Sequence, residues 1–464
     1  TLTGFPYIVA ASATRLPYSG DKDTTLFDKL RNICRNFINL HQNQQAMSIK
    51  TSFLIAAPTS GSGKTTIARG LMKLFTQKGY RVQPFKCGPD YIDTKFHAAV
   101  CGRPSINLDT FMASPEHVRE LFAHYGADAD VCVVEGMMGL FDGYNRELGS
   151  SYEIAKVLDI PVVLVVDAKS AAYSMAALLS GFINFRKDIC FAGVIFNKVG
   201  SERHFKMLQQ VCDDLSITCL GYLPKSPILE HTSRYLGLDF SEDTDNQALV
   251  QLLENHICWE KLLEIKHSLA GNQMFPHGEY AALVARNAES FSFLYQETLD
   301  RFKQVSYFNP ETEVPSFDGI DLLYLPGGYP EKHLEALTRN EAARKAIKTF
   351  ADNGGRIIAE CGGMMYLCKE IITDEGSYTM CDVLPYSISA RQDDRKLSLG
   401  YRQFTLNGQQ FRGHEFHYTQ FVGDVPPSIT QVYNANGEPV PTPVFRYKNV
   451  LASYTHLYQI PSDL

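Results

Sequence analysis

The chain has 464 residues, enough for two or three domains of ordinary size, so a single small module is excluded. Hydrophobic residues make up 45% and charged residues 20% of the sequence, which excludes a largely disordered or fibrous protein. The net charge of -7 argues against nucleic acid as a partner.

The cysteine content and the apolar runs indicate the compartment. The 11 cysteines include no CxxC pair, which argues against a disulfide framework and a zinc ribbon. No apolar run reaches the roughly 18 residues that a membrane helix needs, and the start of the chain lacks a secretory signal pattern. We therefore expect a cytoplasmic protein that does not bind a membrane.

Residues 1–46 differ from the rest of the chain. A polar, turn-forming stretch is followed by a helical pattern at 26–40 and a glutamine-rich stretch, whereas a regular pattern begins directly after Met47. We expect the functional protein to begin near Met47, with residues 1–46 as an extension of uncertain role. An ordered accessory element is the alternative.

From Met47 onward, short apolar runs alternate with helical patterns, as in βα units built on a mostly parallel sheet. The first candidate strands are 53–57, 81–85, 131–134, 162–166 and 192–196. The pattern lapses around 239–280, and further candidate strands follow at 281–285, 321–325 and 356–359. These patterns predict an α/β protein with one domain of the nucleotide-binding type at 47–270 and a second α/β domain at 278–464.

The segment APTSGSGKTT, at 57–66, lies between the first strand and its helix and is typical of a phosphate loop. Glycines let backbone N–H groups turn toward phosphate oxygens, Lys64 can reach the outer phosphates, and Thr65 can ligate magnesium. Pro58 replaces the usual first glycine, but the strand-loop-helix context favours a phosphate loop over an ordinary turn. The candidate ATP-binding residues are Ser60, Gly61, Ser62, Gly63, Lys64, Thr65 and Thr66.

Acidic residues follow other predicted strands of the same domain. Glu135 ends the strand at 131–134 and is our first candidate for a magnesium ligand, together with Thr65. Asp142, downstream, and Asp90 and Asp93, after the strand at 81–85, lie at two further predicted strand exits. Each Asp alone fits an ordinary turn or cap, but strand exits in an open parallel sheet line one crevice, which favours a shared site. Asn197, after a later strand, has an amide that could pair with a purine.

In the second domain, Cys361 lies at a sharp strand-to-helix turn in AECGGMM. A helix N-terminus is expected to lower the pKa of the thiol, and the N–H groups of Gly362 and of Gly328, in LPGGYP, can hold an oxyanion. His456, in a terminal strand, is the candidate base. A buried structural cysteine and a core histidine are the alternatives.

Taken together, these segments resemble the cobyrinate a,c-diamide synthase family from about Ile49 to Leu457. The resemblance rests on APTSGSGKTT, FKCGPDYIDTKFH, VEGMMGLFDG, FNKVG, LPGGYPE, AECGGMMYL, RGHEFHY and ASYTHL. It implies a dethiobiotin-synthetase-like P-loop ATP domain followed by a class I-type glutamine amidotransferase domain. It also implies a ligase that converts two carboxylates of a corrin-type tetrapyrrole into amides, with Mg²⁺ as cofactor and ATP and L-glutamine as co-substrates.

The resemblance also assigns roles. It implies that Glu135 ligates the metal, that three aspartates act around the metal and the reacting carboxylate, and that two residues between them contact the macrocycle. Cys361 carries over as nucleophile, His456 as base and Asn197 as an adenine contact. The three aspartates are Asp90, Asp93 and Asp142, and the two substrate-contacting residues are Tyr91 and Ile92.

One departure from the class I pattern concerns the partner of His456. Tyr458 stands where these amidotransferases have a Glu two residues after the His, so the orienting group is open, and Glu415 is a candidate.

Several alternatives stay open at this point. Hydrogenobyrinate or nickel-sirohydrochlorin could replace cobyrinate as the substrate. A non-amidating nucleotide switch is a further alternative, although Thr59 stands where such switches carry their signature lysine. The amidase reading implies an internal path for ammonia between the domains. A homodimer is one oligomeric state that the sequence leaves open.

Overall fold

The computed structural model describes residues 48–226, 243–269, 278–424 and 427–460. The expectations for residues 1–46 and for a start at Met47 lie outside the described residues. Residues 49–464 form one compact unit, which contains both of the large sheets described below.

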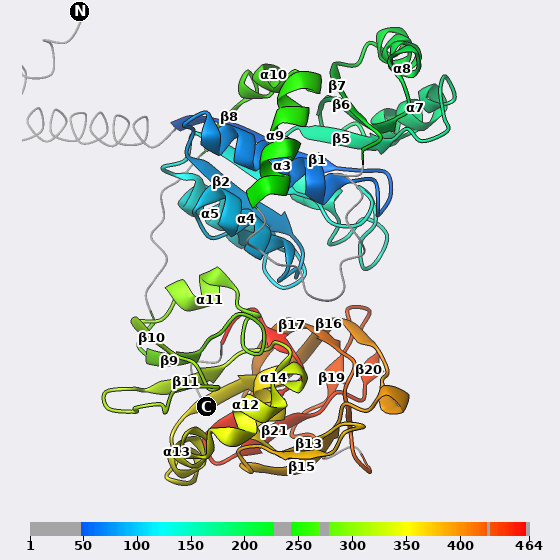
Figure 1. Cartoon of the computed structure of the whole chain (residues 1–464). Coiled ribbons are helices and arrows are strands. Elements are labelled where there is room, and N and C mark those ends of the chain that lie inside the picture. The colour runs from blue at the N-terminus through cyan, green and yellow to red at the C-terminus, as the bar shows by residue number, and fades with distance from the viewer. Residues whose placement is uncertain (1–47, 227–242, 270–277, 425–426, 461–464) are drawn as a thin grey trace, which may run out of the picture. The chain divides into compact units, whose positions relative to one another are not determined.

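The first sheet lies within residues 48–269 and has eight strands (Figure 1). Its order is β3-β2-β4-β1-β5-β6-β7, with β8 beside β1, and the pairs from β3 through β7 are parallel. All five strands predicted in this part of the chain are present, and β3, β7 and β8 were not predicted. The strands are β1 Ser48–Ala56, β2 Val82–Cys87, β3 Ile106–Leu108, β4 Val131–Glu135, β5 Val162–Asp167, β6 Phe191–Val199, β7 Cys219–Pro224 and β8 Lys266–Leu269.

Helices cover both faces of this sheet, which explains why its central strands read as continuous apolar runs. Along β1, Phe53 and Ile55 pack with α3 and α9, whereas Leu54 and Ala56 pack with α5 and α6 on the other face. The helices are α3 Lys64–Gln77, α4 Asp93–Cys101, α5 Pro115–Gly126, α6 Ser151–Leu158, α7 Met175–Phe185, α8 Glu202–Asp214, α9 Asp243–His256 and α10 Trp259–Leu263.

The second large sheet has six strands in the order β10-β9-β11-β12-β22-β21. All of its pairs are parallel except that of β21 with β22. The predicted strands at 281–285, 321–325 and 356–359 correspond to β9, β11 and β12. The elements are β9 Ala281–Ala285, α11 Gln296–Asp300, β10 Gln304–Phe308, β11 Leu322–Leu325, η2 Pro330–Lys332, α12 Leu334–Arg339, α13 Glu341–Asp352, β12 Ile357–Glu360, α14 Gly362–Leu367, β21 Val444–Tyr447 and β22 Val450–Ser453.

Two smaller sheets are formed by strands that follow α14, together with β23 after β22. Their orders are β14-β13-β15-β18 and β20-β19-β16-β17-β23, and the sequence analysis did not anticipate them. The elements are β13 Cys368–Ile372, β14 Ser377–Thr379, β15 Leu384–Ser389, η3 Gln392–Asp394, β16 Ser398–Leu406, β17 Gln409–His417, β18 Gln420–Phe421, β19 Val432–Tyr433, β20 Pro439–Val440 and β23 His456–Leu457.

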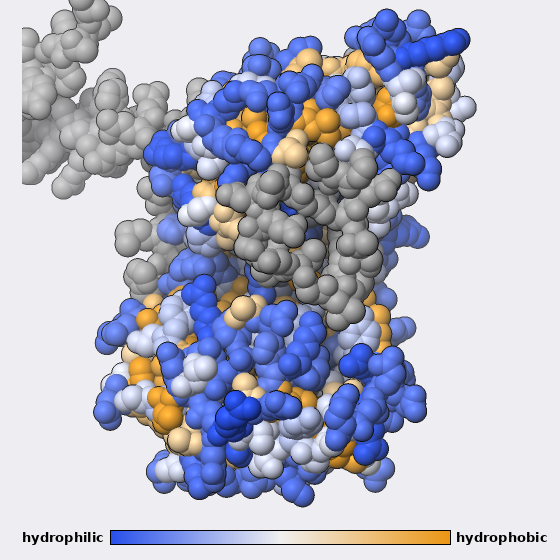
Figure 2. All heavy atoms as spheres, viewed as in Figure 1, coloured by the Kyte–Doolittle hydropathy of each residue, from blue (hydrophilic) through white to orange (hydrophobic). Residues whose placement is uncertain are grey.

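On the face that Figure 2 shows, hydrophilic residues predominate and hydrophobic ones appear in small groups. The large hydrophobic side chains that are exposed come from several separate elements, among them Phe185, Val314 and Leu399. Within the described residues, every helix is too short or too polar to span a lipid bilayer.

The helix that follows the phosphate loop packs closely on α9, which yields a stability prediction. A Cβ on Gly70 of α3 would lie 2.3 Å from Leu253 Cδ1 and 2.9 Å from Leu249 Cγ. We expect Gly70→Ala to lower the free energy of unfolding by about 1–3 kcal/mol through overpacking. Urea denaturation of the purified variant measures this change.

Gly181 of α7 provides the matched control, because a Cβ there would meet no heavy atom of the described chain within 4 Å. Gly181→Ala should raise the free energy of unfolding by about 0.4–1 kcal/mol, since alanine loses less backbone entropy in a helix. Equal effects of the two substitutions would contradict the close packing of α3 on α9.

Candidate functional site

Three loops that carry candidate residues meet at one edge of the first sheet. In the strand order, β2, β4 and β1 are adjacent and parallel, so their carboxyl ends lie side by side. The phosphate-loop segment follows β1, the loop with Asp90 and Asp93 follows β2, and Glu135 ends β4. The strand exits that carry the candidate residues are therefore neighbours, as predicted, and their function as one site stays a prediction.

The loop at 57–63 has the backbone that its glycines predict. Gly61 and Gly63 have φ angles of 78° and 95°, and α3 begins at Lys64. Asn197 on β6 donates a hydrogen bond from Nδ2 to Ser62 O at 2.9 Å, and a Cβ on Gly63 would lie 2.2 Å from that nitrogen. In this structure the Asn197 amide supports the loop. The predicted contact of this amide with adenine stays a prediction.

Buried charges converge on Glu135, which is completely buried. Its carboxylate lies 2.5 Å from Thr65 Oγ1, 2.6 Å from His97 Nε2 and 3.0 Å from Lys86 Nζ. Burial alone would raise the pKa of Glu135, but Lys86, His97 and Thr65 stabilise the carboxylate and hold its pKa below the usual range.

Lys86 also bridges to a second carboxylate. Its ammonium lies 2.7 Å from Asp93 Oδ2, and the nearby carboxylates raise the pKa of Lys86 despite its burial. Burial raises the pKa of Asp93 to about 6, an effect that Lys86 opposes. The sequence analysis assigned no role to Lys86 or His97. A signal for Lys86 was present in the sequence, because a lysine inside a buried strand is rarely found without an oppositely charged partner.

The other two predicted aspartates shape their loops. Asp90 Oδ1 accepts hydrogen bonds from Ile92 N and Asp93 N at 2.8 and 2.9 Å, which starts α4. Asp142 is exposed, and its Oδ2 accepts from Gly139 N at 3.0 Å. A Cβ on Gly139 would lie 2.6 Å from Pro58 O, so this turn rests against the phosphate loop.

The described residues contain no cluster of three or more His, Cys, Asp or Glu side chains arranged around a metal position. Mg²⁺ does not require one, because it usually takes one or two carboxylates and completes its shell with water and substrate phosphates. Thr65 and Glu135, whose oxygens lie 2.5 Å apart, are the ligands predicted for such an ion, and this role stays a prediction.

Cys361 lies at the carboxyl end of β12, one of the two middle strands of the second large sheet. It follows β12, and the neighbours of β12 are β11, which leads into Gly327 and Gly328, and β22, which leads toward His456. Cys361 has φ 46° and ψ -109° and is only 3% exposed. This is the strained strand-to-helix turn that the sequence predicts.

The predicted lowering of the Cys361 pKa is not observed. Burial, reinforced by the charge of Glu331, raises the pKa of the thiol above its usual range, and the hydrogen bond from the Gly362 N–H only partly opposes this. The helix that begins here, α14, has six residues, so its dipole is small compared with the effect of burial. The thiol therefore needs a base to become a nucleophile.

The two glycines predicted to hold an oxyanion come together from separate loops. A Cβ on Gly362 would lie 3.1 Å from Gly328 N and 3.0 Å from Gly328 O. A Cβ on the preceding Gly327 would lie 2.0 Å from His456 Cε1. The imidazole thus occupies the space that a side chain at position 327 would need.

His456 and Cys361 both lie against β17. Cys361 Sγ is 3.8 Å from Phe416 O, and His456 pairs in register with His414. His456 is completely buried, and neither ring nitrogen has a hydrogen-bond partner among the described residues. Burial, together with the charges of His414 and His417, lowers the pKa of His456 to about 3.

Glu415, our candidate partner for His456, is engaged elsewhere. Its carboxylate accepts hydrogen bonds from Arg402 and from Thr442 at 2.6 Å, and lies 2.8 Å from His417 Nε2. The Glu415 carboxylate therefore binds Arg402, His417 and Thr442 in this structure and does not orient His456.

Tyr91 lies between the two groups of candidate residues. It is 7% exposed, its ring centroid is 5.1 Å from that of His456, and it stacks on Phe293 at 5.0 Å. Ile92 is half-buried at the start of α4. The predicted contact of both residues with a macrocycle stays a prediction.

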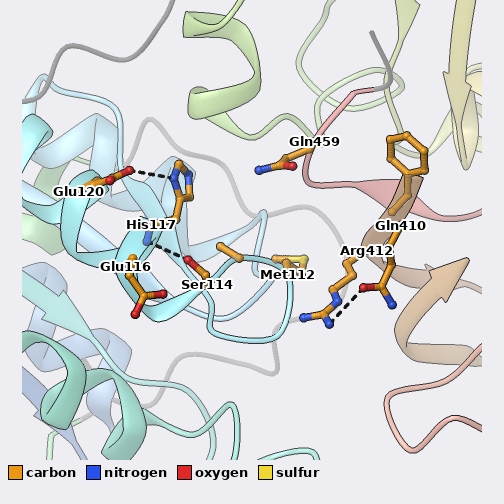
Figure 3. A pocket seen from close by; sticks show the side chains of 10 residues that line it. Met112, Ser114, Glu116, His117, Glu120, Gln410, Arg412 and Gln459 are labelled. Carbon is orange, nitrogen blue, oxygen red and sulfur yellow. Dashed lines mark hydrogen bonds and ion pairs between the residues drawn. The ribbon is translucent and has the colours of Figure 1, made fainter. Parts of the chain in front are cut away.

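A separate cavity of about 410 Å³ opens near the carboxyl end of β3 (Figure 3). Ser114 caps α5 there by accepting a hydrogen bond from His117 N at 3.1 Å, and Arg412 donates to Phe111 O at 2.9 Å. None of the predicted site residues lines this cavity, whose lining is Met112, Ala113, Ser114, Glu116, His117, Glu120, Gln410, Phe411, Arg412 and Gln459.

Comparison with known proteins identifies both halves of this arrangement. Residues 53–235 match the CobQ/CobB/MinD/ParA nucleotide binding domain, and residues 287–462 match the CobB/CobQ-like glutamine amidotransferase domain. The first match contains the phosphate loop and Glu135, and the second contains Cys361 and His456.

The curated relatives cover most of the chain. Cobyrinate a,c-diamide synthase from Caldanaerobacter subterraneus subsp. tengcongensis is 37% identical and spans 87% of this chain and 94% of its own length. The enzyme of the same name from Listeria monocytogenes is 36% identical over 87% and 95%. Hydrogenobyrinate a,c-diamide synthase from Brucella abortus is 37% identical over 89% and 99%. The chain therefore belongs to the family of cobyrinate and hydrogenobyrinate a,c-diamide synthases.

Proposed function

We propose that this glutamine-dependent amide ligase uses ATP to convert the a and c side-chain carboxylates of cobyrinate or hydrogenobyrinate into amides in cobalamin biosynthesis. The observation that carries the proposal is that one chain holds a phosphate loop whose helix contacts the buried Glu135 and, on a second sheet, Cys361 followed by Gly362, which approaches Gly328, with His456 against the adjacent Gly327. The amidotransferase domain and the named relatives argue against a non-amidating nucleotide switch. Nickel-sirohydrochlorin has no support among the named relatives quoted above.

Ammonia is released at Cys361. His456 takes the thiol proton, the thiolate attacks the amide carbon of glutamine, and the N–H groups of Gly328 and Gly362 stabilise the oxyanion. His456 then returns the proton to the leaving nitrogen, and ammonia departs. Water hydrolyses the thioester and releases glutamate.

The tetrapyrrole carboxylate is activated at the edge of the first sheet. Transfer of the γ-phosphoryl group of ATP to a carboxylate oxygen gives an acyl phosphate, and ammonia displaces phosphate to leave the amide. Lys64 approaches the outer phosphates of ATP. Lys86 balances the negative charge of the Asp93 and Glu135 carboxylates. A magnesium ion at Thr65 and Glu135 would neutralise phosphate charge.

Four further residues are proposed to act near the tetrapyrrole substrate: Tyr91, Ile92, Asp90 and Asp142. Asp142 shapes a turn that borders the phosphate loop, and Tyr91 and Ile92 directly follow Asp90, which shapes the turn after β2. Asn197 is the proposed adenine contact. The cytoplasmic location, a homodimer and the boundaries 47–270 and 278–464 stay predictions from the sequence.

The separation of the two sites yields a first activity prediction. Cys361→Ser should abolish glutamine-dependent amidation, because a hydroxyl is a much poorer nucleophile than a thiolate. Amidation with ammonium at high pH should continue near the wild-type rate, since the synthetase site is untouched. Product chromatography with each nitrogen donor measures both activities, and loss of both in a folded variant would contradict the two-site arrangement.

A second activity prediction concerns Asp142. If this carboxylate organises phosphoryl transfer, Asp142→Asn should lower kcat for ammonium-dependent synthesis by about 10²–10³-fold, the size typical of one lost electrostatic stabiliser. Hydrolysis of glutamine should be unchanged. Asp393→Asn, which alters an exposed carboxylate in η3, is the control. Synthesis at the wild-type rate by the Asp142 variant would remove Asp142 from the catalytic site.

A further inference from the structure

The glutaminase site contains a base whose orienting partner is not identified by the family pattern. A histidine that takes a proton at one ring nitrogen works best when an acceptor holds the proton on the other nitrogen. Class I amidotransferases use a Glu two residues after the His, but here Tyr458 occupies that position. Tyr458 Oη instead points toward Asn107 O, at 3.4 Å, and Glu415 is bonded to other residues.

Glu360, the last residue of β12, presents a carboxyl group to the imidazole. Its Oε2 lies 4.0 Å from His456 Nδ1, within reach of a small adjustment of either side chain. Oε2 also accepts a hydrogen bond from Tyr324 Oη at 2.9 Å, and Oε1 accepts one from Leu457 N at 3.1 Å. Leu457 directly follows His456, so the carboxyl group is bonded to the same backbone segment that carries the base.

The sheet register explains how the residue before the nucleophile can serve the base. Glu360 pairs with Ser453 across β12 and β22, and the chain from Ser453 reaches His456 three residues later. The positive φ of Cys361 turns the backbone sharply after Glu360, so neighbouring residues can direct their side chains to different parts of one site. Glu360 is 2% exposed and His456 is completely buried, which excludes bulk water as a competing partner.

We propose that Glu360 is the positioning residue of His456 and takes the part that the Glu after the His plays in other class I amidotransferases. This inference rests on the proposed glutaminase function of Cys361 and His456. In the active form, Glu360 is ionised and His456 is neutral, with its proton on Nδ1 facing the carboxylate. Nε2 is then free to take the proton from the Cys361 thiol, and the carboxylate stabilises the imidazolium that forms.

The electrostatics give this pair a recognisable pH dependence. Burial raises the pKa of Glu360 to about 8, while the hydrogen bonds from Tyr324 and Leu457 N oppose the shift. The active form therefore becomes populated as the pH rises toward this value, which sets the acid limb of kcat/KM for glutamine. The other titratable groups that face His456 are His414, Glu415 and His417 of β17 and Tyr91 after β2.

Two variants test the pair in opposite directions. Glu360→Gln removes the carboxylate, so the acid limb should move to lower pH and kcat for glutamine hydrolysis should fall by roughly 10²-fold. The KM for glutamine should stay near the wild-type value. Tyr324→Phe keeps the carboxylate but removes a hydrogen bond that lowers its pKa, so the acid limb should move to higher pH. Glu370→Gln, at a carboxylate bonded to Ser377 and Ser387, is the control.

Ammonium-dependent amidation by the same proteins separates the possible results. If the wild-type protein lacks ammonium-dependent amidation, the proposed function is wrong, and this result is independent of Glu360. If the Glu360→Gln variant keeps wild-type glutaminase kcat and pH profile, the positioning role is overturned. Parallel loss of glutaminase and ammonium-dependent activity in that variant would also overturn it, because Glu360 would then serve only the fold.

Discussion

The ion pairs of Lys86 are the interaction on which the arrangement of the synthetase site depends. A buried ammonium group is tolerated only when it is closely paired, and here Asp93 from the loop after β2 and Glu135 from the end of β4 lie within 3.0 Å of it. Glu135 in turn contacts Thr65 in the first turn of α3. One buried cation thus ties the three strand exits together, and removing it would leave the buried Asp93 without its ion-pair partner and Glu135 with only His97 and Thr65.

The same loop that supplies Asp93 reaches the second site. Tyr91 packs against His456, Phe293 and Tyr295. The Asp90 carboxylate accepts hydrogen bonds from the N–H groups of Ile92 and Asp93, which closes the backbone turn around Tyr91. A single turn, from Asp90 to Asp93, therefore contacts both Lys86 and His456, the proposed base.

Local motifs allowed much of this to be predicted from the sequence. The phosphate loop, Glu135, the glycine loops and the turn at Cys361 all follow from short patterns whose backbone requirements are local. Lys86, His97 and Glu360 were not predicted, because each acts through partners distant in sequence: His97 meets Glu135, and Glu360 meets Tyr324 and Leu457. The two smaller sheets were missed because no α-helix separates their strands among the described residues, so the alternation of strand and helix patterns that marks the large sheets is lacking there.

Burial links the remaining features of the glutaminase site in a causal order. Ammonia is mostly ammonium at neutral pH, so the proposed glutaminase site must exclude water, and Cys361 and His456 are 3% and 0% exposed. The same burial raises the pKa of the thiol and lowers that of the imidazole, which leaves both groups neutral. Proton transfer between them then creates two charges in a dry environment. A carboxylate beside the imidazole reduces that cost, which is why a buried acid such as Glu360 belongs next to a buried base.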